Sequence, residues 1–210
     1  MNFHIIDIQN SERKEYFEHY FTNVPCTFSI TTDIDITNLI NQKLKLYPTM
    51  IYLLTSIVNR TVEFRMSIDD NGNVGYFDEM NPSYTIFHKD SSTFSSLWTH
   101  YDNDYKLFLD NYLVDIKSFG NTKKIFPKPN EPSNTFPISM IPWTQFTSFN
   151  LNLEKGYKYL LPIFTMGKFY KKENKTFLPT TIQVHHAVCD GYHVSKFIDD
   201  LQLEINNFTL

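Results

Sequence analysis

The ten residues VHHAVCDGYH, from Val184 to His193, lie between an alternating apolar run and the amphipathic C-terminal segment of a 210-residue chain. They hold three histidines, one cysteine, one aspartate and one glycine. The run before them has the two-residue period of a β-strand, and the segment after Gly191 has the period of an α-helix. The stretch therefore predicts a strand, a turn and a helix, with ionisable side chains gathered at the turn.

The predicted strand, LPTTIQVHH over 178–186, divides its side chains between two faces. One face carries Thr180, Ile182, Val184 and His186, and the other carries Thr181, Gln183 and His185. His186 thus belongs to the apolar face and emerges where the strand ends. A partly desolvated imidazole in this position suits a general base near pH 7. Asp190 follows in the turn, close enough to steady the loop or the ring.

Two other interpretations of the motif remain open at this point. His186 could be a core histidine that is satisfied by hydrogen bonds beside a turn aspartate. A zinc site could instead be built from His185, His186 and Asp190. The zinc interpretation is weaker, because adjacent strand residues point to opposite faces and the sequence has no Cys/His pairs at zinc-finger spacing.

Composition limits the class of protein. Hydrophobic residues make up 41% and aromatic residues 16% of the chain, which is enough for a large core and for ring-lined surfaces. The net charge of −4 and the lack of a basic stripe argue against a nucleic-acid partner. With no signal peptide and no 18-residue apolar run, the chain is expected to be cytoplasmic and not to bind membranes. Cys26 and Cys189 are expected to be free thiols.

Alternating strands and helices predict one domain over residues 1–210, an α/β two-layer sandwich in which α-helices flank a mixed β-sheet. Strands are predicted at Phe3–Ile8, Cys26–Thr37, Tyr84–His88, 138–143 and 148–153, and in hairpins over 63–79 and 159–186 that turn at Asn71–Gly72 and Glu173–Asn174. Helices are predicted at 10–21, Tyr47–Arg60, Tyr101–Phe119 and after Gly191. The Pro-rich segment 120–137 is the one long loop, and long ordered loops often carry function.

The first predicted helix has an arginine on an aromatic stripe. Arg13, Phe17, Tyr20 and Phe21 stand at helical spacing on one face. The arginine either extends its charged end to water along that face or is partly buried and needs a carboxylate partner.

Further motifs accompany the turn: RKEYFEHYF, VPCTFSIT, DIT, YPTMIY, FRMSI, YTIFH, TFSSLW, ISMIPW, SFNLNL, PIFTMGK and IQVHHAVCDGYHV. In order and spacing, over essentially the whole chain, they resemble the chloramphenicol acetyltransferases, trimeric acetyl-coenzyme A enzymes of antibiotic resistance. The motif His-His-x-x-x-Asp-Gly alone also resembles peptide-synthetase condensation domains. The motif and a related form of it also resemble the acyltransferase domains of 2-oxoacid dehydrogenase complexes. The proteins of these two groups are longer or have different flanking residues. The resemblance implies the coenzyme A-dependent acyltransferase fold.

The resemblance implies a role for each matched residue near the motif. His186 is expected to be the general base that takes the proton from the primary 3-hydroxyl of chloramphenicol, with its ring held by its own backbone carbonyl. Ser139 is expected to donate to the oxyanion, with Thr165 supporting it through ordered water. Arg13 and Asp190 are expected to form a structural ion pair, which would supply the partner that Arg13 needs.

The resemblance also implies where the substrates bind. The residues expected around chloramphenicol are aromatic or apolar with a few polar groups: Tyr20, Cys26, Phe28, Thr85, Phe94, Phe126, Phe149 and Leu151. Trp143 is expected near the coenzyme A channel. Acetyl-CoA is the expected co-substrate, and neither a metal nor a phosphate-binding glycine loop is expected.

A homotrimer with active sites at its subunit interfaces is a further implication of the resemblance. One protomer would line the pocket through Tyr20, Phe28 and Leu151, and the facing protomer would supply His186. Two alternatives remain: an acetyltransferase for another hydroxylated small molecule, and a non-catalytic binder of apolar ligands. The presence of His186, Ser139, Asp190 and Arg13 argues against a mere binder, which would need none of them.

Overall fold

A computed structural model describes residues 2–153 and 158–210. Within them, the larger sheet has seven strands in the order β2-β10-β8-β7-β5-β6, with β9 paired to β10. The β5–β7 and β7–β8 pairs are parallel and the others antiparallel, so the sheet is mixed as predicted. The strands are β2 (Thr27–Asp35), β5 (Asn81–His88), β6 (Thr93–Trp98), β7 (Thr135–Met140), β8 (Ile163–Met166), β9 (Tyr170–Lys172) and β10 (Lys175–His185).

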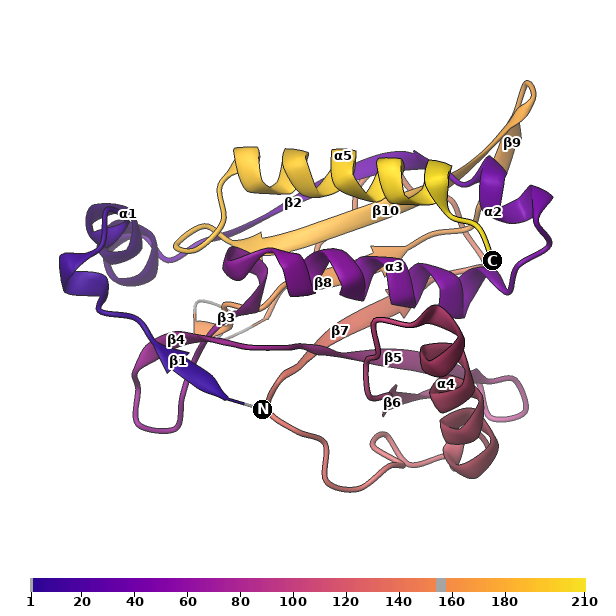
Figure 1. Cartoon of the computed structure of the whole chain (residues 1–210), viewed down its shortest axis with the longest axis horizontal. Coiled ribbons are helices and arrows are strands. Elements are labelled where there is room, and N and C mark those ends of the chain that lie inside the picture. The colour runs from indigo at the N-terminus through magenta and orange to yellow at the C-terminus, as the bar shows by residue number, and fades with distance from the viewer. Residues whose placement is uncertain (1, 154–157) are drawn as a thin grey trace.

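Helices form the second layer. In Figure 1, α3 and α5 lie side by side across one face of the sheet, and α4 lies beside the end that carries β5 and β6. The α-helices are α1 (Lys14–Glu18), α2 (Thr37–Asn41), α3 (Leu46–Arg60), α4 (Tyr105–Phe119) and α5 (Gly191–Asn207). Shorter helical segments are η1 (Ile8–Asn10), the π-helical η2 (His19–Asn23) and η3 (Val62–Arg65). A small second sheet pairs β1 (Phe3–Ile5) and β3 (Met66–Ile68) with β4 (Val74–Phe77).

The core lies between these two layers. Val194, Phe197, Leu201 and Ile205 form the buried stripe of α5, at the spacing predicted from the sequence. The Phe197 ring packs on Phe64 at 4.8 Å and on Phe164 of β8 at 5.2 Å. Loss of such a buried ring typically costs about 3–5 kcal/mol of stability. This packing fixes the start of α5, and therefore the turn before it, against the sheet.

The predicted hairpins are present. Gly72 has φ +83° at the β3–β4 turn, a backbone conformation that glycine adopts without strain. Glu173 has φ +55° at the turn between β9 and β10. Both turns lie where the sequence places them.

Several predicted elements differ from the observed ones. The strand predicted at 138–143 is β7 over Thr135–Met140, so the predicted loop 120–137 ends at residue 134. The first strand ends at Ile5 because η1 follows it. Helix α4 begins at Tyr105 because the Asp104 side chain caps it, accepting from the backbone N–H groups of Lys106 and Leu107. The predicted helix 10–21 is a short α1 that continues into η2. Residues 148–153 do not form a strand. There the Gln183 side chain bonds both the N–H and the C=O of Leu151, which replaces a strand partner.

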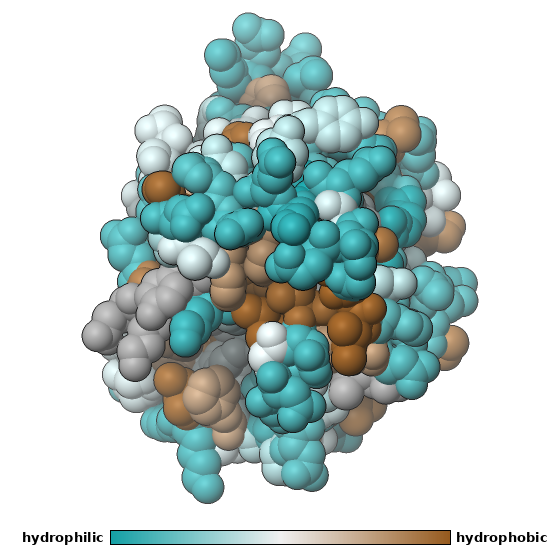
Figure 2. Space-filling model, turned by 90° about the vertical axis from the view of Figure 1, so that its left-hand side faces the viewer, coloured by the Kyte–Doolittle hydropathy of each residue, from teal (hydrophilic) through white to brown (hydrophobic). Residues whose placement is uncertain are grey.

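Figure 2 shows the end of the molecule that is on the left in Figure 1, where β10 ends and α1 lies. Apolar residues gather at the centre of this face, with hydrophilic residues around them. Contiguous exposed apolar surface of this kind marks a binding or association site.

Candidate active site

The turn after β10 places His186 beside the neighbouring strand. β10 ends at His185, and the His186 N–H donates to the carbonyl of Cys26 at 3.0 Å. Val184 lies opposite Phe28, so the antiparallel register brings His186 to the same face as these two residues. The turn closes where α5 begins, and the Asp190 N–H donates to Nδ1 of His193 at 3.0 Å. This agrees with the face that the sequence predicts for His186.

The His186 ring is held by aromatic contacts. It stacks on Tyr20 with centroids 3.9 Å apart and an interplanar angle of 7°, and Phe28 meets it edge-on at 5.2 Å. Nδ1 is buried and makes no hydrogen bond within the described residues, although Oδ1 of Asp190 lies 3.4 Å away. The expected bond from the ring to its own carbonyl is therefore not present. Because the side chain is 30% exposed while Nδ1 is buried, Nε2 is the nitrogen left for a substrate.

Arg13 and Asp190 join α1 to the start of α5. Two guanidinium nitrogens of Arg13 donate to the two carboxylate oxygens of Asp190, at 2.8 and 3.3 Å. The side chains are 26% and 32% exposed, so the pair is partly shielded from water. The hydrogen bond from Arg13 lowers the pKa of Asp190 and keeps this carboxylate ionised beside His186. This geometry resolves the alternatives for Arg13 in favour of a partnered guanidinium.

Ser139 and Thr165 form a second polar group, on the middle strands of the sheet. Their hydroxyl oxygens lie 3.0 Å apart, because Ser139 of β7 and Thr165 of β8 are register partners. Thr165 thus contacts Ser139 directly, where support through ordered water was expected. The same row continues to Thr181 of β10 and to Thr31 of β2, whose hydroxyls lie 2.7 Å apart. Ser139 can donate to another group when Thr165 is the donor within their pair. A hydroxyl so oriented can stabilise an oxyanion.

His186 and Ser139 do not meet within one chain. Ser139 shares its row with Thr181, and His186 follows Thr181 by five residues. At the rise of a strand, five residues span about 17 Å. Strand alternation also places His186 and Thr181 on opposite faces. The base and the hydroxyl of a single chain are therefore too far apart to act on one reacting centre.

The structure divides the other expected pocket residues into two groups. Tyr20, Cys26, Phe28 and Leu151 lie near the end of β10. Thr85, Phe94, Phe126, Trp143 and Phe149 lie elsewhere, on β5, on β6 and in loops. Tyr20 and Phe28 contact the same chain's His186, so their expected place on the subunit facing His186 is wrong. Tyr20 lies on η2, and Phe28 lies on β2 opposite Val184 of β10, so both reach the ring from within the same chain.

The second group has its own aromatic contacts. Phe87 of β5 lies opposite Phe94 of β6, and its ring meets Trp143 edge-on at 4.6 Å. The Phe94, Phe126 and Trp143 side chains are exposed. The Thr85 carbonyl accepts from the Tyr47 hydroxyl, and the Phe149 ring lies 5.8 Å from that of Phe146. Exposed rings on one sheet edge and its loops offer a surface for an apolar or aromatic ligand.

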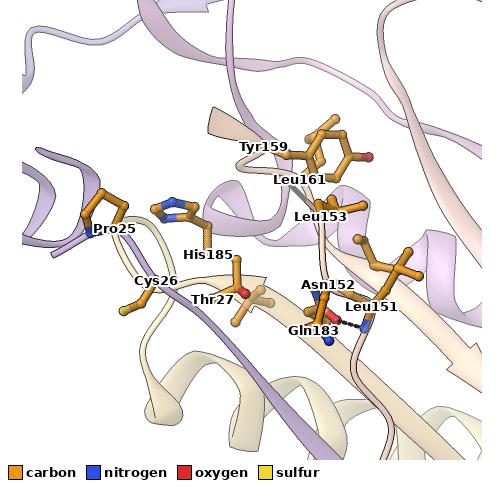
Figure 3. A pocket seen from close by; sticks show the side chains of 12 residues that line it. Pro25, Cys26, Thr27, Leu151, Asn152, Leu153, Tyr159, Leu161, Gln183 and His185 are labelled. Atoms are coloured by element: carbon orange, nitrogen blue, oxygen red, sulfur yellow. Dashed lines mark hydrogen bonds between the residues drawn. The ribbon is translucent and has the colours of Figure 1, made fainter. Parts of the chain in front are cut away.

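A cavity of about 210 Å³ opens beside the end of β10. Figure 3 shows Pro25, Cys26 and His185 on one side of it and Leu151, Leu153 and Tyr159 on the other. The dashed bond from Gln183 to Leu151 holds the second side in place. Sequence reasoning missed Gln183 as the residue that positions Leu151, and nothing but its place in the strand alternation pointed to it.

Both cysteines are free, and burial raises the pKa of each thiol. Raised values disfavour the reactive thiolate, which fits the expectation of small packing groups. Among the described residues, no set of three His, Cys, Asp or Glu side chains is arranged to hold a metal ion. In the same part of the chain, no helix has the length and apolar character needed to cross a membrane.

Comparison with solved structures identifies the class of fold. The chain aligns with a chloramphenicol acetyltransferase at a TM-score of 0.84 and 24% identity, covering 97% of this chain and all of that one. It aligns with an Azotobacter vinelandii dihydrolipoamide acetyltransferase at a TM-score of 0.66 and 14% identity, covering 92% and 86%. The architecture is thus that of the coenzyme A-dependent acyltransferases.

Comparison of sequences narrows this class to one family. The family model described as chloramphenicol acetyltransferase matches residues 1–202. A chloramphenicol acetyltransferase from Campylobacter coli is 57% identical over 206 residues, covering 98% of this chain and all of that protein. The chain belongs to the chloramphenicol acetyltransferase family.

Proposed function

We propose that this protein transfers the acetyl group of acetyl-CoA to the primary 3-hydroxyl of chloramphenicol, which inactivates the antibiotic. The observation that carries the proposal is the His186 ring, stacked on Tyr20 with Nδ1 buried and Nε2 left open, in a chain 57% identical to a chloramphenicol acetyltransferase. The proposed catalytic unit is a single domain over residues 1–210, which works in the cytoplasm.

The proposed chemistry is general-base acyl transfer in a ternary complex. Nε2 of His186 takes the proton of the 3-hydroxyl as its oxygen attacks the thioester carbonyl. The carbonyl electrons move to the oxygen, and Ser139 donates a hydrogen bond to this oxyanion while Thr165 donates to Ser139. Collapse of the intermediate breaks the carbon–sulfur bond, and the proton on His186 passes to the departing thiolate. Acetylated drug and coenzyme A leave.

In this scheme the exposed rings bind the substrates. The aromatic ring and chlorinated tail of chloramphenicol would lie among the apolar residues of both groups, and the coenzyme A arm would pass Trp143. Acetyl transfer by a base and a hydroxyl donor does not require a metal.

We propose that the working form is a homotrimer in which the active site is shared. The support is the distance between His186 and Ser139 within a chain, about 17 Å along the strand direction. A second copy would bring its Ser139 row opposite the first copy's His186. The apolar face at the end of β10 offers the surface for such an association.

Two other functions stay as alternatives, an acetyltransferase for another hydroxylated molecule and a non-catalytic binder of apolar ligands. The test is release of the coenzyme A thiol from acetyl-CoA, followed with a thiol reagent in the presence and absence of chloramphenicol. The proposal predicts release that depends on the drug. Release with other alcohols but not with chloramphenicol would favour an acetyltransferase for another molecule. No release with any acceptor would favour a non-catalytic binder.

A further inference from the structure

The long loop between α4 and β7 carries Phe126, one of the residues expected around the drug. Phe126 is 60% exposed, so little packing around the residue holds it in place. The loop backbone is anchored on both sides of it instead. Upstream, Ser96 of β6 donates its N–H to the carbonyl of Ile125 at 2.6 Å, and Ser95 donates its hydroxyl to the carbonyl of Lys124 at the same distance.

The downstream anchor is the ammonium group of Lys128. It lies 2.8 Å from the Asp115 carboxylate of α4, 3.2 Å from the Trp98 carbonyl and 3.7 Å from the centroid of the Trp98 ring. The Lys128 and Asp115 side chains are 17% and 11% exposed. Thr99 donates to the same carboxylate at 2.8 Å. A largely desolvated cation with a carboxylate, a carbonyl and an indole around it is held firmly.

The sequence between the anchor and the ring is stiff. In FPKP, residues 126–129, Phe126 and Lys128 each precede a proline. A following proline disfavours the helical conformation of the residue before it and favours an extended one. Pro127 also fixes its own φ. The placement of Lys128 therefore restricts the direction in which Phe126 leaves the loop.

We propose that Lys128 is a positioning residue for the acceptor pocket, because its ion pair with Asp115 holds Phe126 against the drug. The proposal rests on the proposed function. Chloramphenicol is uncharged, so Lys128 acts through the geometry of the loop and not through its charge on the substrate. Removal of the anchor then weakens binding of the drug and leaves the chemical step and acetyl-CoA binding as they are.

The test measures steady-state constants for Lys128→Met and for Asp115→Asn, which keeps the shape of the carboxyl group but removes its charge. Each should raise the KM for chloramphenicol about three- to tenfold, the size of one aromatic contact. The kcat and the KM for acetyl-CoA should be unchanged. The matched control is Lys123→Met in the same loop, whose ion pair with Asp90 is exposed, and it should leave all three constants unchanged.

A double variant separates positioning from general loosening of the fold. In a Phe126→Ala background, Lys128→Met should add nothing to the KM for chloramphenicol, because the ring that it positions is gone. An unchanged KM in the single variants, or equal effects with and without the Phe126 ring, would overturn the inference. Wild-type protein that releases no thiol with chloramphenicol would instead overturn the proposed function.

Discussion

His185 and His186 are neighbours in the chain but have different surroundings. His185 is 1% exposed, and its Nδ1 accepts from the N–H of Ala187 at 3.1 Å within the turn. His186 stacks on Tyr20 and keeps Nε2 open. A proton acceptor for a substrate must be reachable, so the two residues have separable functions: His186 in catalysis and His185 in holding the turn.

His186→Ala should lower kcat by about 10²–10⁴-fold, the usual worth of general-base assistance. His185→Ala should mainly lower the thermal unfolding temperature, because the turn loses the acceptor for the Ala187 N–H. Activity and thermal unfolding of both variants are compared. If folded His185→Ala protein is less active than folded His186→Ala protein, His185 is the catalytic base and His186 holds the turn.

Ser139→Ala should lower kcat by about 10²–10³-fold, the cost of losing one oxyanion donor. Both Michaelis constants should stay near wild type, because the bond forms only as charge develops on the carbonyl oxygen. Steady-state kinetics with each substrate varied decides the point. A large rise in KM with normal kcat would make Ser139 a substrate-binding residue.

The Arg13–Asp190 ion pair ties α1 and η2 to the turn before α5. Tyr20 lies on η2 and His186 lies in that turn, so the pair also keeps the two stacked rings together. Since the side chains are 26% and 32% exposed, the contribution is that of a charged hydrogen bond rather than of a fully buried pair.

Arg13→Val and Asp190→Ala should each lower the free energy of unfolding by about 1.5–3 kcal/mol, the worth of hydrogen bonds to charged groups. The double variant should lose less than the sum of the two. Urea unfolding of the wild type, the two single variants and the double variant gives the four free energies of this double-mutant cycle. Strict additivity would mean that the two side chains contribute independently.

The Arg13–Asp190 pair should make the free energy of unfolding depend on pH in the acidic range. The folded-state pKa of Asp190 lies below its ordinary value of 3.8, because Arg13 donates to the carboxylate. The stabilisation is therefore complete above that value and is lost as pH falls toward the lower folded-state pKa. The difference in unfolding free energy between wild type and Arg13→Val should therefore stay constant above the ordinary pKa and shrink as the pH falls below it. A difference that stays constant below the ordinary pKa as well would contradict the linkage.

Periodicity predicted most elements because most of them have one buried face. It placed α3, α5, both hairpins and the face of His186, since the strand alternation and the helix stripe are local patterns. It failed at residues 148–153, where the Gln183 side chain takes the place of a strand partner. It could not place Tyr20 over His186 or Lys128 against Asp115, because distant packing decides both contacts.

Acetyl transfer as proposed requires two chains to meet. One chain offers His186 at the end of β10, and the Ser139–Thr165 pair lies on the middle strands, about 17 Å along the sheet. Acetyl transfer needs the base and the oxyanion donor within hydrogen-bond reach of one reacting centre. A protein that acts as proposed must therefore combine His186 of one copy with Ser139 of another.

The most direct test of this claim co-expresses His186→Ala and Ser139→Ala chains under separate affinity tags and purifies the oligomers that carry both tags. Each pure variant should be nearly inactive with chloramphenicol and acetyl-CoA. In mixed oligomers, some interfaces pair an intact His186 with an intact Ser139, so drug-dependent thiol release should rise far above the sum of the two pure variants. Mixed oligomers whose activity is no higher than that sum, with both variants folded and assembled, would contradict the shared site.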